Sequence, residues 1–199
     1  PPMRTSRSLL FALATSAICT ANAQVFEEGS NLLGVGVGIG GSYGIGFTGS
    51  GVSQSPALAL HFDHGMGDLG PGTWGLGGFL GYKSYSYTYD NIWFNGNYTS
   101  KYKWTYVVVG ARGTWHYNDW HGNDKLDTYG GVMLAYRAAT FKDETNYPNG
   151  VGSYNAGTYS GVWLNGLLGA RYMFSDKFGA YGELGFGVSV FQLGLSVKL

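Results

Sequence analysis

The sequence predicts an all-β fold, an eight-stranded antiparallel up-and-down transmembrane β-barrel. The 199-residue chain contains 35 glycines and 17% aromatic residues but only 12% charged residues, which is unusual for a soluble globular domain. Apolar residues alternate with small or polar residues along eight segments, as they do in a β-strand whose two faces meet different surroundings.

The clearest of these segments covers residues 190–199. Its small or polar positions are Gln192, Gly194, Ser196 and Lys198. Its apolar positions are Phe191, Leu193, Leu195, Val197 and Leu199. A barrel in a membrane needs such a strand to close its sheet against the first strand, because an open edge leaves unsatisfied backbone groups in lipid.

Each of the eight segments approaches or exceeds the roughly 9–11 residues that a tilted membrane strand needs. In chain order they are residues 32–40, 57–64, 74–85, 102–117, 128–141, 159–174, 178–188 and 190–199. The apolar face of the first seven carries Leu33, Val35, Val37 and Ile39; Leu58, Leu60 and Phe62; Trp74, Leu76, Leu80 and Tyr82; Val107, Val109, Ala111, Trp115 and Tyr117; Val132, Leu134 and Tyr136; Val162, Leu164, Leu168, Tyr172 and Phe174; and Ala180, Leu184, Phe186 and Val188.

The opposite face of each strand is small, polar or charged. It carries Gly34, Gly36, Gly38 and Gly40; Ala59, His61 and Asp63; Gly75, Gly77, Phe79, Gly81 and Lys83; Val108, Gly110, Arg112, Thr114 and His116; Met133, Ala135 and Arg137; Asn165, Gly169 and Arg171; and Tyr181, Glu183 and Gly185. A charge at the lipid midplane costs about 2–4 kcal/mol, so the charge-free apolar face is expected to meet lipid. A lipocalin-like soluble barrel would instead place its polar face in water.

The connections alternate in length, as they do between the two ends of such barrels. After the second, fourth and sixth strands they are residues 65–73, 118–127 and 175–177, and after the odd strands they are longer, up to residues 86–101. The last connection is the exception, since pairing Val188 with Phe191 leaves only Ser189 and Val190 as a tight turn. An aromatic girdle is expected at the short-turn end, formed by Trp74, Trp115, Tyr117, Tyr172 and Phe174.

The first 23 residues have the pattern of a cleaved secretory signal peptide. Arg4 and Arg7 precede the apolar run 9–14, and Ala-Asn-Ala at 21–23 fits a cleavage site. The run is too short for a membrane-spanning helix. Cys19 lies inside this segment, and the alternative that it is a lipidated cysteine fits the preceding residues poorly.

Residues 24–199 are then a single barrel domain without cysteine. The twelve basic residues less Arg4 and Arg7 leave ten, against twelve acidic residues. This balance gives no basic face for a nucleic-acid partner.

The stretches NLLGVGVGIG, LLGARYMF and ELGFGVSVFQLGLSVKL resemble the small outer-membrane β-barrel family of OmpA transmembrane, OmpX and opacity-type proteins, in the form found in the Bacteroidetes lineage. The resemblance covers the whole domain as a pattern of strands. It implies a Gram-negative outer membrane location, lipid as surroundings, and a C-terminal strand read by the barrel-assembly machinery. The family usually ends in Phe, whereas this chain ends in Leu199.

The predicted lumen carries a set of charges that need partners, because an unpaired buried charge is costly. The set is Arg112, Arg137, Arg171, Glu183, Lys83 and Asp63, with His61 and Lys198 on the same face. If Phe174 pairs with Phe178, Arg171 lies opposite Tyr181; in the neighbouring pair, Glu183 faces Ser196. One interpretation is an ionic plug, and the other is a gated path for small solutes. Eight strands leave room only for side chains, which favours the plug.

Three further motifs contain residues of the kinds found in catalytic, metal or nucleotide sites. His61 and Asp63 share a face that His64 does not, so they do not converge on a metal or hydrolase site, and Asp119, His121 and Asp124 are expected to be solvated turn residues. Residues 36–41 match GxGxxG, but a nucleotide fingerprint needs a following helix, and these glycines recur with the period of a strand. We therefore expect no catalytic residue, no cofactor and no metal.

A tyrosine-rich stretch is the best candidate for binding an extracellular ligand. Its members are Tyr85, Tyr87, Tyr89, Trp93, Phe94 and Tyr98, followed by Tyr102. Tyr and Trp supply rigid amphipathic contact area, as in recognition loops. The alternative is that strands three and four extend beyond the membrane and pair through these aromatic residues. The expected role is structural or surface-interacting, with a narrow channel and then an outer-membrane lipid-modifying enzyme as alternatives.

Overall fold

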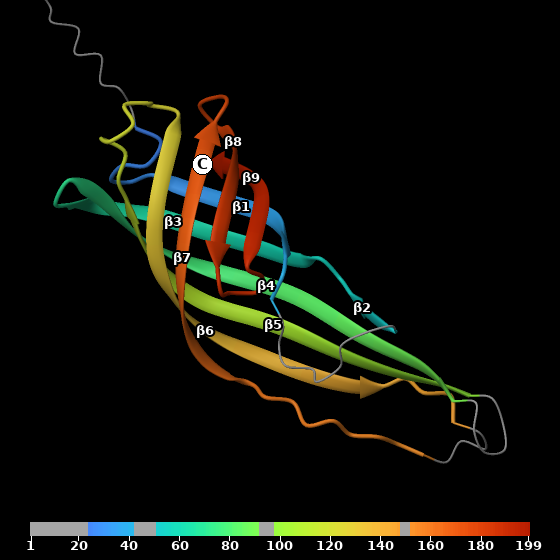
Figure 1. Ribbon diagram of the computed structural model, residues 1–199. Coiled ribbons are helices and arrows are strands. Elements are labelled where there is room, and N and C mark those ends of the chain that lie inside the picture. Colours follow the sequence, from blue (N-terminus) through green and yellow to red (C-terminus); the bar gives the residue numbers. More distant parts are fainter. Residues whose placement is uncertain (1–23, 42–50, 92–97, 148–151) are drawn as a thin grey trace, which may run out of the picture.

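The computed structural model describes residues 24–41, 51–91, 98–147 and 152–199 (Figure 1). The described chain forms nine strands: β1 Asn31–Ile39, β2 Val52–Gln54, β3 Ala57–Leu69, β4 Gly72–Asn91, β5 Tyr98–His116, β6 Leu126–Asp143, β7 Gly161–Met173, β8 Phe178–Gly185 and β9 Phe191–Lys198. Within these ranges there is no helix with the length and apolar character to cross a membrane. The predicted signal peptide, Trp93 and Phe94 lie outside the described residues.

Eight of these strands close into an antiparallel up-and-down barrel, as the sequence predicts. The sheet order is β2-β4-β3-β1-β9-β8-β7-β6-β5, and the pairing of β4 with β5 closes it. β2 is an additional short strand that pairs with β4 outside this circle. Following paired residues once around the circle leaves β7 at Val162 and returns to it at Tyr172, ten residues further along. This stagger tilts the strands, and with eight strands the interior is just wide enough for side chains.

The barrel has two unlike ends. At one end, called the turn end, lie residues 70–71, 117–125 and 174–177, together with the lead-in 24–30. At the other end β4, β5 and β6 run on well beyond β8, β9 and β1, so this side of the wall is much taller (Figure 1). The part of β4, β5 and β6 that projects beyond the other strands is called the extension.

Two predicted connections are largely strand. Residues 65–73 continue β3 and begin β4, with only Gly70 and Pro71 between them, because a β-bulge at Gly65/Gly67 lets the ladder proceed. Gly67 and Gly70 have φ of 128° and 63°, which favour glycine. The predicted connection 86–101 is also wrong, since β4 and β5 pair as far as Asn91 and Tyr98.

The predicted turn between the last two strands is wrong in register. Leu184, not Val188, pairs with Phe191, and Glu183 pairs with Gln192 rather than Ser196. Residues 186–190 form the connection, and Val188 and Ser189 are buried instead of pairing. The shift is four residues, an even number, so the residues of β8 and β9 keep their predicted faces. Val188 does not, because the connection turns it from the predicted outer face into the interior, where it is fully buried. On the other side of β8, Arg171 does lie opposite Tyr181, as predicted.

Glycines on the inner wall make room for large neighbours, as expected from their period. A Cβ atom at Gly34 would overlap the His61 ring, and one at Gly169 would overlap the Tyr129 ring. A Cβ atom at Gly36 would come similarly close to the Tyr181 hydroxyl. The GxGxxG match therefore belongs to a strand whose glycines accommodate packing inside the barrel.

We expect Gly169→Ala to destabilise the barrel by about 1–3 kcal/mol, because the added methyl group forces the buried Tyr129 ring to move. Gly166→Ala is the matched control, since a Cβ atom there on the same strand meets open space. Denaturant unfolding in detergent or liposomes measures both. Equal stability of the two variants would contradict the packing role of Gly169.

Candidate functional site

The barrel interior near the turn end holds a buried ionic cluster. Arg112 Nε lies 2.9 Å from Asp63 Oδ1, and Arg112 Nη2 lies 2.8 Å from Glu183 Oε2. Arg171 makes ion pairs of 3.4 Å with Asp63 and 3.0 Å with Asp127. Asp63 therefore bridges two arginines.

Aromatic and polar side chains surround this cluster. The Tyr129 ring lies 5.9 Å from the Arg112 guanidinium and 5.2 Å from that of Arg171, within range of a cation–π attraction. Its hydroxyl donates a hydrogen bond of 3.3 Å to Glu183. All these charged groups are buried, so each depends on its partners for the solvation that water would supply.

The lead-in closes the barrel at the turn end. Phe26 is fully buried and stacks on His116 with ring centroids 3.7 Å apart. The lead-in is tied to β3 by backbone hydrogen bonds from Gly29 to Gly65 and from Gly65 to Ser30, each 2.9 Å. Val25 and Phe26 pack with Leu32 and Met173.

An apolar layer closes the interior on the other side of the ionic cluster. It contains Ala57, Ala59, Phe79, Val108, Tyr129, Met133, Ala135, Leu167 and Val188. Val188 reaches it because the connection 186–190 turns inward. The charges therefore lie between the lead-in and this apolar layer.

The structure brings four of the six predicted lumen charges together and leaves two elsewhere. Arg112, Arg171, Glu183 and Asp63 form the cluster, and His61 lies beside it, 4.0 Å from Asp63. Lys83 instead donates hydrogen bonds to the carbonyl oxygens of Gly40 and Gly41. Arg137 stacks on Trp163, 4.4 Å from the ring centroid. Lys198 lies at the turn end, 3.5 Å from the Gln24 carbonyl oxygen.

Two members of the interior were missed from the sequence. Asp127, expected in a connection, is a fully buried residue of β6. His116 lies on the inner face, as predicted, but its contact with the cluster was not expected. Its Nδ1 atom lies 2.8 Å from Asp127 Oδ1. Extending the alternation of β6 backwards from Arg137 reaches Asp127 on the inner face, and that signal would have found it.

Asp127, His116 and Thr114 form a hydrogen-bonded series with the order of a hydrolase triad. His116 Nδ1 lies 2.8 Å from Asp127 and its Nε2 lies 2.9 Å from Thr114 Oγ1. All three side chains are buried, and Phe26 covers the imidazole, so no face is left for a substrate. Among the described residues, no three His, Cys, Asp or Glu side chains are arranged to hold a metal ion.

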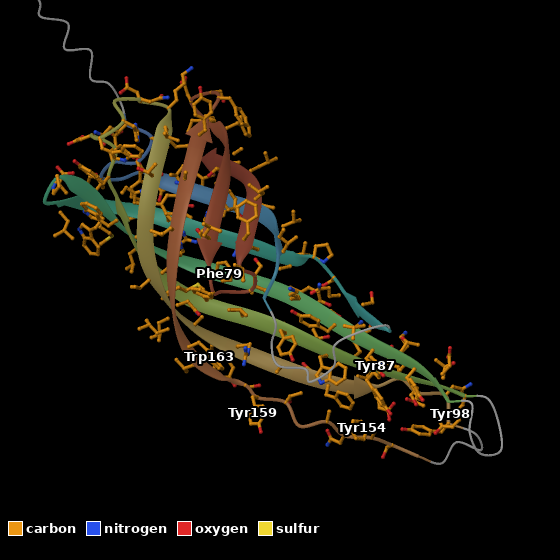
Figure 2. The ribbon with its side chains drawn as sticks, viewed as in Figure 1. Phe79, Tyr87, Tyr98, Tyr154, Tyr159 and Trp163 are labelled. Carbon is orange, nitrogen blue, oxygen red and sulfur yellow. The ribbon has the colours of Figure 1, made fainter. Side chains whose placement is uncertain are left out.

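The described tyrosines of this stretch lie on the extension, in strands β4 and β5 (Figure 2). Tyr85 is buried with Trp104 and Tyr106, and Tyr87 lies opposite Tyr102. Further rings line the same inner face, with Tyr102 stacked on Phe141 at 6.0 Å. The aromatic residues thus pair across strands, which was the alternative to a binding loop.

The outer end of the extension is held by a carboxylate. Thr145 N, Tyr147 Oη and Tyr154 N donate hydrogen bonds of 2.9, 2.8 and 2.7 Å to Asp143. Partial desolvation raises the pKa of Asp143, but these hydrogen bonds outweigh it and lower the pKa to about 2. They fasten Thr145, Tyr147 and Tyr154 to the end of β6.

The C-terminal strand lies between β8 and β1. Its apolar positions lie on the outer face, where Leu193, Leu195 and Leu199 are exposed. Recognition of Phe191, Leu193, Leu195, Val197 and Leu199 by an assembly machinery stays a prediction.

No protein-family model matches the chain, and the comparison with curated proteins gives no match. Solved structures do resemble it. Ail, the attachment invasion locus protein of Yersinia pestis, crystallised with the heparin analogue sucrose octasulfate, is 12% identical with a TM-score of 0.46 over 87% of this chain and 99% of that one. The outer membrane protein OprG from Pseudomonas aeruginosa is 16% identical with a TM-score of 0.46 over 87% and 97%. A de novo designed transmembrane β-barrel is 12% identical with a TM-score of 0.41 over 87% and 98%.

We expect Asp63→Asn to destabilise the barrel by about 3–5 kcal/mol, because it leaves two buried arginines short of a carboxylate. Asp68→Asn on the same strand is the control, since Asp68 is exposed, and it should change stability by less than about 0.5 kcal/mol. Denaturant titration of the refolded protein measures both. An unchanged midpoint for Asp63→Asn would refute the bridging role.

Proposed function

We propose that this chain is an integral outer-membrane β-barrel protein whose lumen is closed by its own side chains, and that it acts as a structural or surface-presenting protein without enzymatic activity. The observation that supports this best is a reversal of polarity along β4, β5 and β6. It divides the molecule into a part suited to lipid and a part suited to water.

Over the barrel, the outer face is apolar and the inner face is charged. Leu80, Tyr82, Val107, Val109, Leu134 and Tyr136 are all exposed. Beyond Tyr82 and its partner Val107, the outward positions become polar on all three strands. They are Ser84, Ser86, Thr88 and Asp90; Lys101, Lys103 and Thr105; and Thr140 and Lys142. The inner face also changes along these strands, from the ionic cluster through the apolar layer to the aromatic residues of the extension.

This reversal is what a boundary between lipid and water requires. Water on the outside of the barrel would leave a continuous apolar band exposed, far larger than soluble monomers tolerate. Lipid on the outside stabilises that band and excludes charge from it. The extension, with aromatic residues inside and lysines outside, is suited to water.

Aromatic residues at the turn end support a second boundary. Trp74, Trp115, Tyr172, Phe174 and Phe178 are exposed there. Trp115 stacks on Tyr117 at 5.4 Å and donates a 3.0 Å hydrogen bond from Nε1 to the Leu69 carbonyl oxygen. Such amphipathic rings favour the membrane interface.

The outer membrane is the natural place for such a chain. A lipid-facing β-barrel and the secretory pattern of residues 1–23 both favour it. Short turns then face the periplasm and the extension faces the exterior. The ionic cluster, capped by Phe26 and by the Val188 layer, favours a plug over a solute path.

We expect the refolded protein to be silent in a planar bilayer, and the double variant Arg112→Ala/Glu183→Ala to conduct, because it removes a buried ion pair without changing net charge. Lys101→Ala/Glu144→Ala is the control, since it removes an ion pair of 3.0 Å on the extension. Discrete openings of the unmodified protein would contradict the plug and favour a narrow channel.

We expect Leu134→Arg to cost about 2–4 kcal/mol of folding free energy in lipid vesicles, because it places a charge in the apolar band. Thr140→Arg lies on the same strand and face beyond the boundary and should cost less than about 0.5 kcal/mol. Denaturant titration with heat-modifiable gel mobility reports both. Similar costs would mean that the band does not face lipid.

A further inference from the structure

The barrel wall has a gap between β7 and the β8–β9 connection. The ladder between β7 and β8 begins only at Leu167 and Gly185, whereas β7 starts at Gly161. Among the described strands, only β6 pairs with residues 161–166. Across the gap, residues 186–190 turn into the interior, where Val188 and Ser189 are buried.

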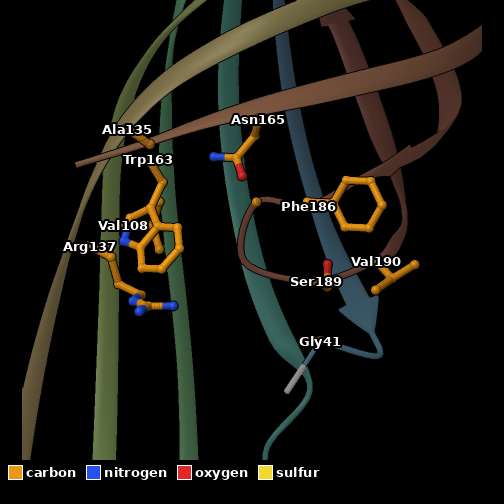
Figure 3. Close-up of a pocket in the computed structure, with 10 residues that line it drawn as sticks. Gly41, Val108, Ala135, Arg137, Trp163, Asn165, Phe186, Ser189 and Val190 are labelled. Atoms are coloured by element: carbon orange, nitrogen blue, oxygen red, sulfur yellow. The ribbon is translucent and has the colours of Figure 1, made fainter. Parts of the chain in front are cut away.

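A pocket of about 290 Å³ lies behind this gap. Its lining includes Val108, Ala135, Arg137, Trp163, Asn165 and Phe186, completed by Ser189 and Val190 of the connection (Figure 3). Trp163 and Arg137 stand side by side on one wall, and the connection that carries Ser189 and Val190 forms the other (Figure 3). Trp163 belongs to the inner face of β7, yet it is 48% exposed because no strand covers it across the gap.

The gap opens through the apolar band, close to its outer boundary. Val162, Leu164, Phe186 and Val190, around its rim, are exposed to between 42% and 75%. Arg137 pairs with Val108 and Gly161, just below the level at which the outer face of β6 becomes polar. In a membrane, the pocket would therefore lie where head groups meet the first methylenes of the lipid chains.

The pocket combines one cation with mostly apolar walls. The Arg137 guanidinium lies 4.4 Å from the Trp163 ring centroid and 5.8 Å from that of Tyr106. The aromatic rings restrict the orientation of the guanidinium. The planar N–H donors of a guanidinium match the geometry of a carboxylate or phosphate group. Val108, Ala135 and Phe186 offer apolar contact beside it.

We propose that this pocket binds a single-chain anionic amphiphile from the surrounding lipid layer, with its head group on Arg137 and its alkyl chain leaving through the gap into the apolar band. The inference rests on the proposed membrane location. The volume is small for a whole ligand, so it fits a head group and the first part of a chain. Near the interface, polar head-group atoms and water also supply partners for the backbone edge of β7, which lipid chains cannot do.

The test uses dodecanoate brominated next to its carboxylate, because bromine quenches tryptophan fluorescence on contact. The protein is placed in nanodiscs of zwitterionic phosphatidylcholine, and quenching is titrated for the unmodified chain and for Trp163→Phe. We expect a saturable component that Trp163→Phe lacks. Quenching that never saturates, or that survives in Trp163→Phe, would overturn the proposal.

The charge is tested with Arg137→Gln, which keeps a polar side chain of similar reach. It should raise the half-saturation concentration about tenfold or more, since a charge-assisted contact is lost. Lys142→Gln removes a 75% exposed cation from the same strand and should leave binding unchanged. Equal effects of the two variants would refute a site on Arg137.

A further variant tests whether the ligand occupies the pocket, and two further probes test whether binding needs both the charge and the alkyl chain. Asn165→Phe fills the pocket while retaining Arg137 and should abolish the saturable component. The corresponding bromoalcohol, which lacks the charge, and bromobutanoate, which lacks the chain, should both fail to saturate. Tight binding of bromobutanoate would indicate a site for water-borne anions and overturn the lipid source.

Heat-modifiable mobility and nanodisc insertion are checked for every variant before titration. A chain that does not insert contradicts the membrane location. A chain that inserts normally but shows no saturable quenching of Trp163 contradicts only this inference.

Discussion

Two arginines taken out of water inside a narrow barrel are the constraint on which the rest of this structure depends. Arg112 and Arg171 have no solvent, so Asp63, Glu183 and Asp127 must reach them from β3, β8 and β6. Five strands, with β5 and β7, are thereby tied together through the lumen as well as through their backbones. Removing any one carboxylate leaves at least one guanidinium with a single carboxylate partner in place of two, so the cluster stabilises the barrel most as a complete set.

Much else follows from making room for this cluster and sealing it. Glycines on β1 and β7 leave space for His61 and Tyr129 beside the charges. Phe26 from the lead-in and Val188 from the last connection then close the two sides with apolar surface. Burial between these layers lowers the local dielectric, which strengthens each ion pair and also raises the cost of losing one.

The number of barrel strands, the faces of those strands and the closed topology were predictable, because side chains of different polarity alternate along every barrel strand. The register between neighbouring strands could not be predicted from this alternation. A shift of four residues between β8 and β9 keeps Glu183 and Gln192 on the inner face, so alternation alone cannot detect it. Of the lumen charges, Arg112, Arg171, Glu183 and Asp63 were foreseen together, but Arg137 and Lys83 share their face at a different depth. The position of a side chain along the barrel axis depends on the stagger between strands, and this stagger is known only when all eight strands are paired.

The same inward turn of residues 186–190 that adds Val188 to the apolar layer also leaves the gap in the wall. In the register of β7 and β8, a strand β8 continued to Val188 would have reached Leu164 of β7 and narrowed the gap beside Trp163. Drawing Val188 into the apolar layer instead shortens both strands and leaves Arg137 and Trp163 behind a lateral opening. The burial of Val188 in the apolar layer and the lateral opening beside Arg137 and Trp163 are therefore two consequences of one connection, and a variant with a tight turn in its place would be expected to lose both.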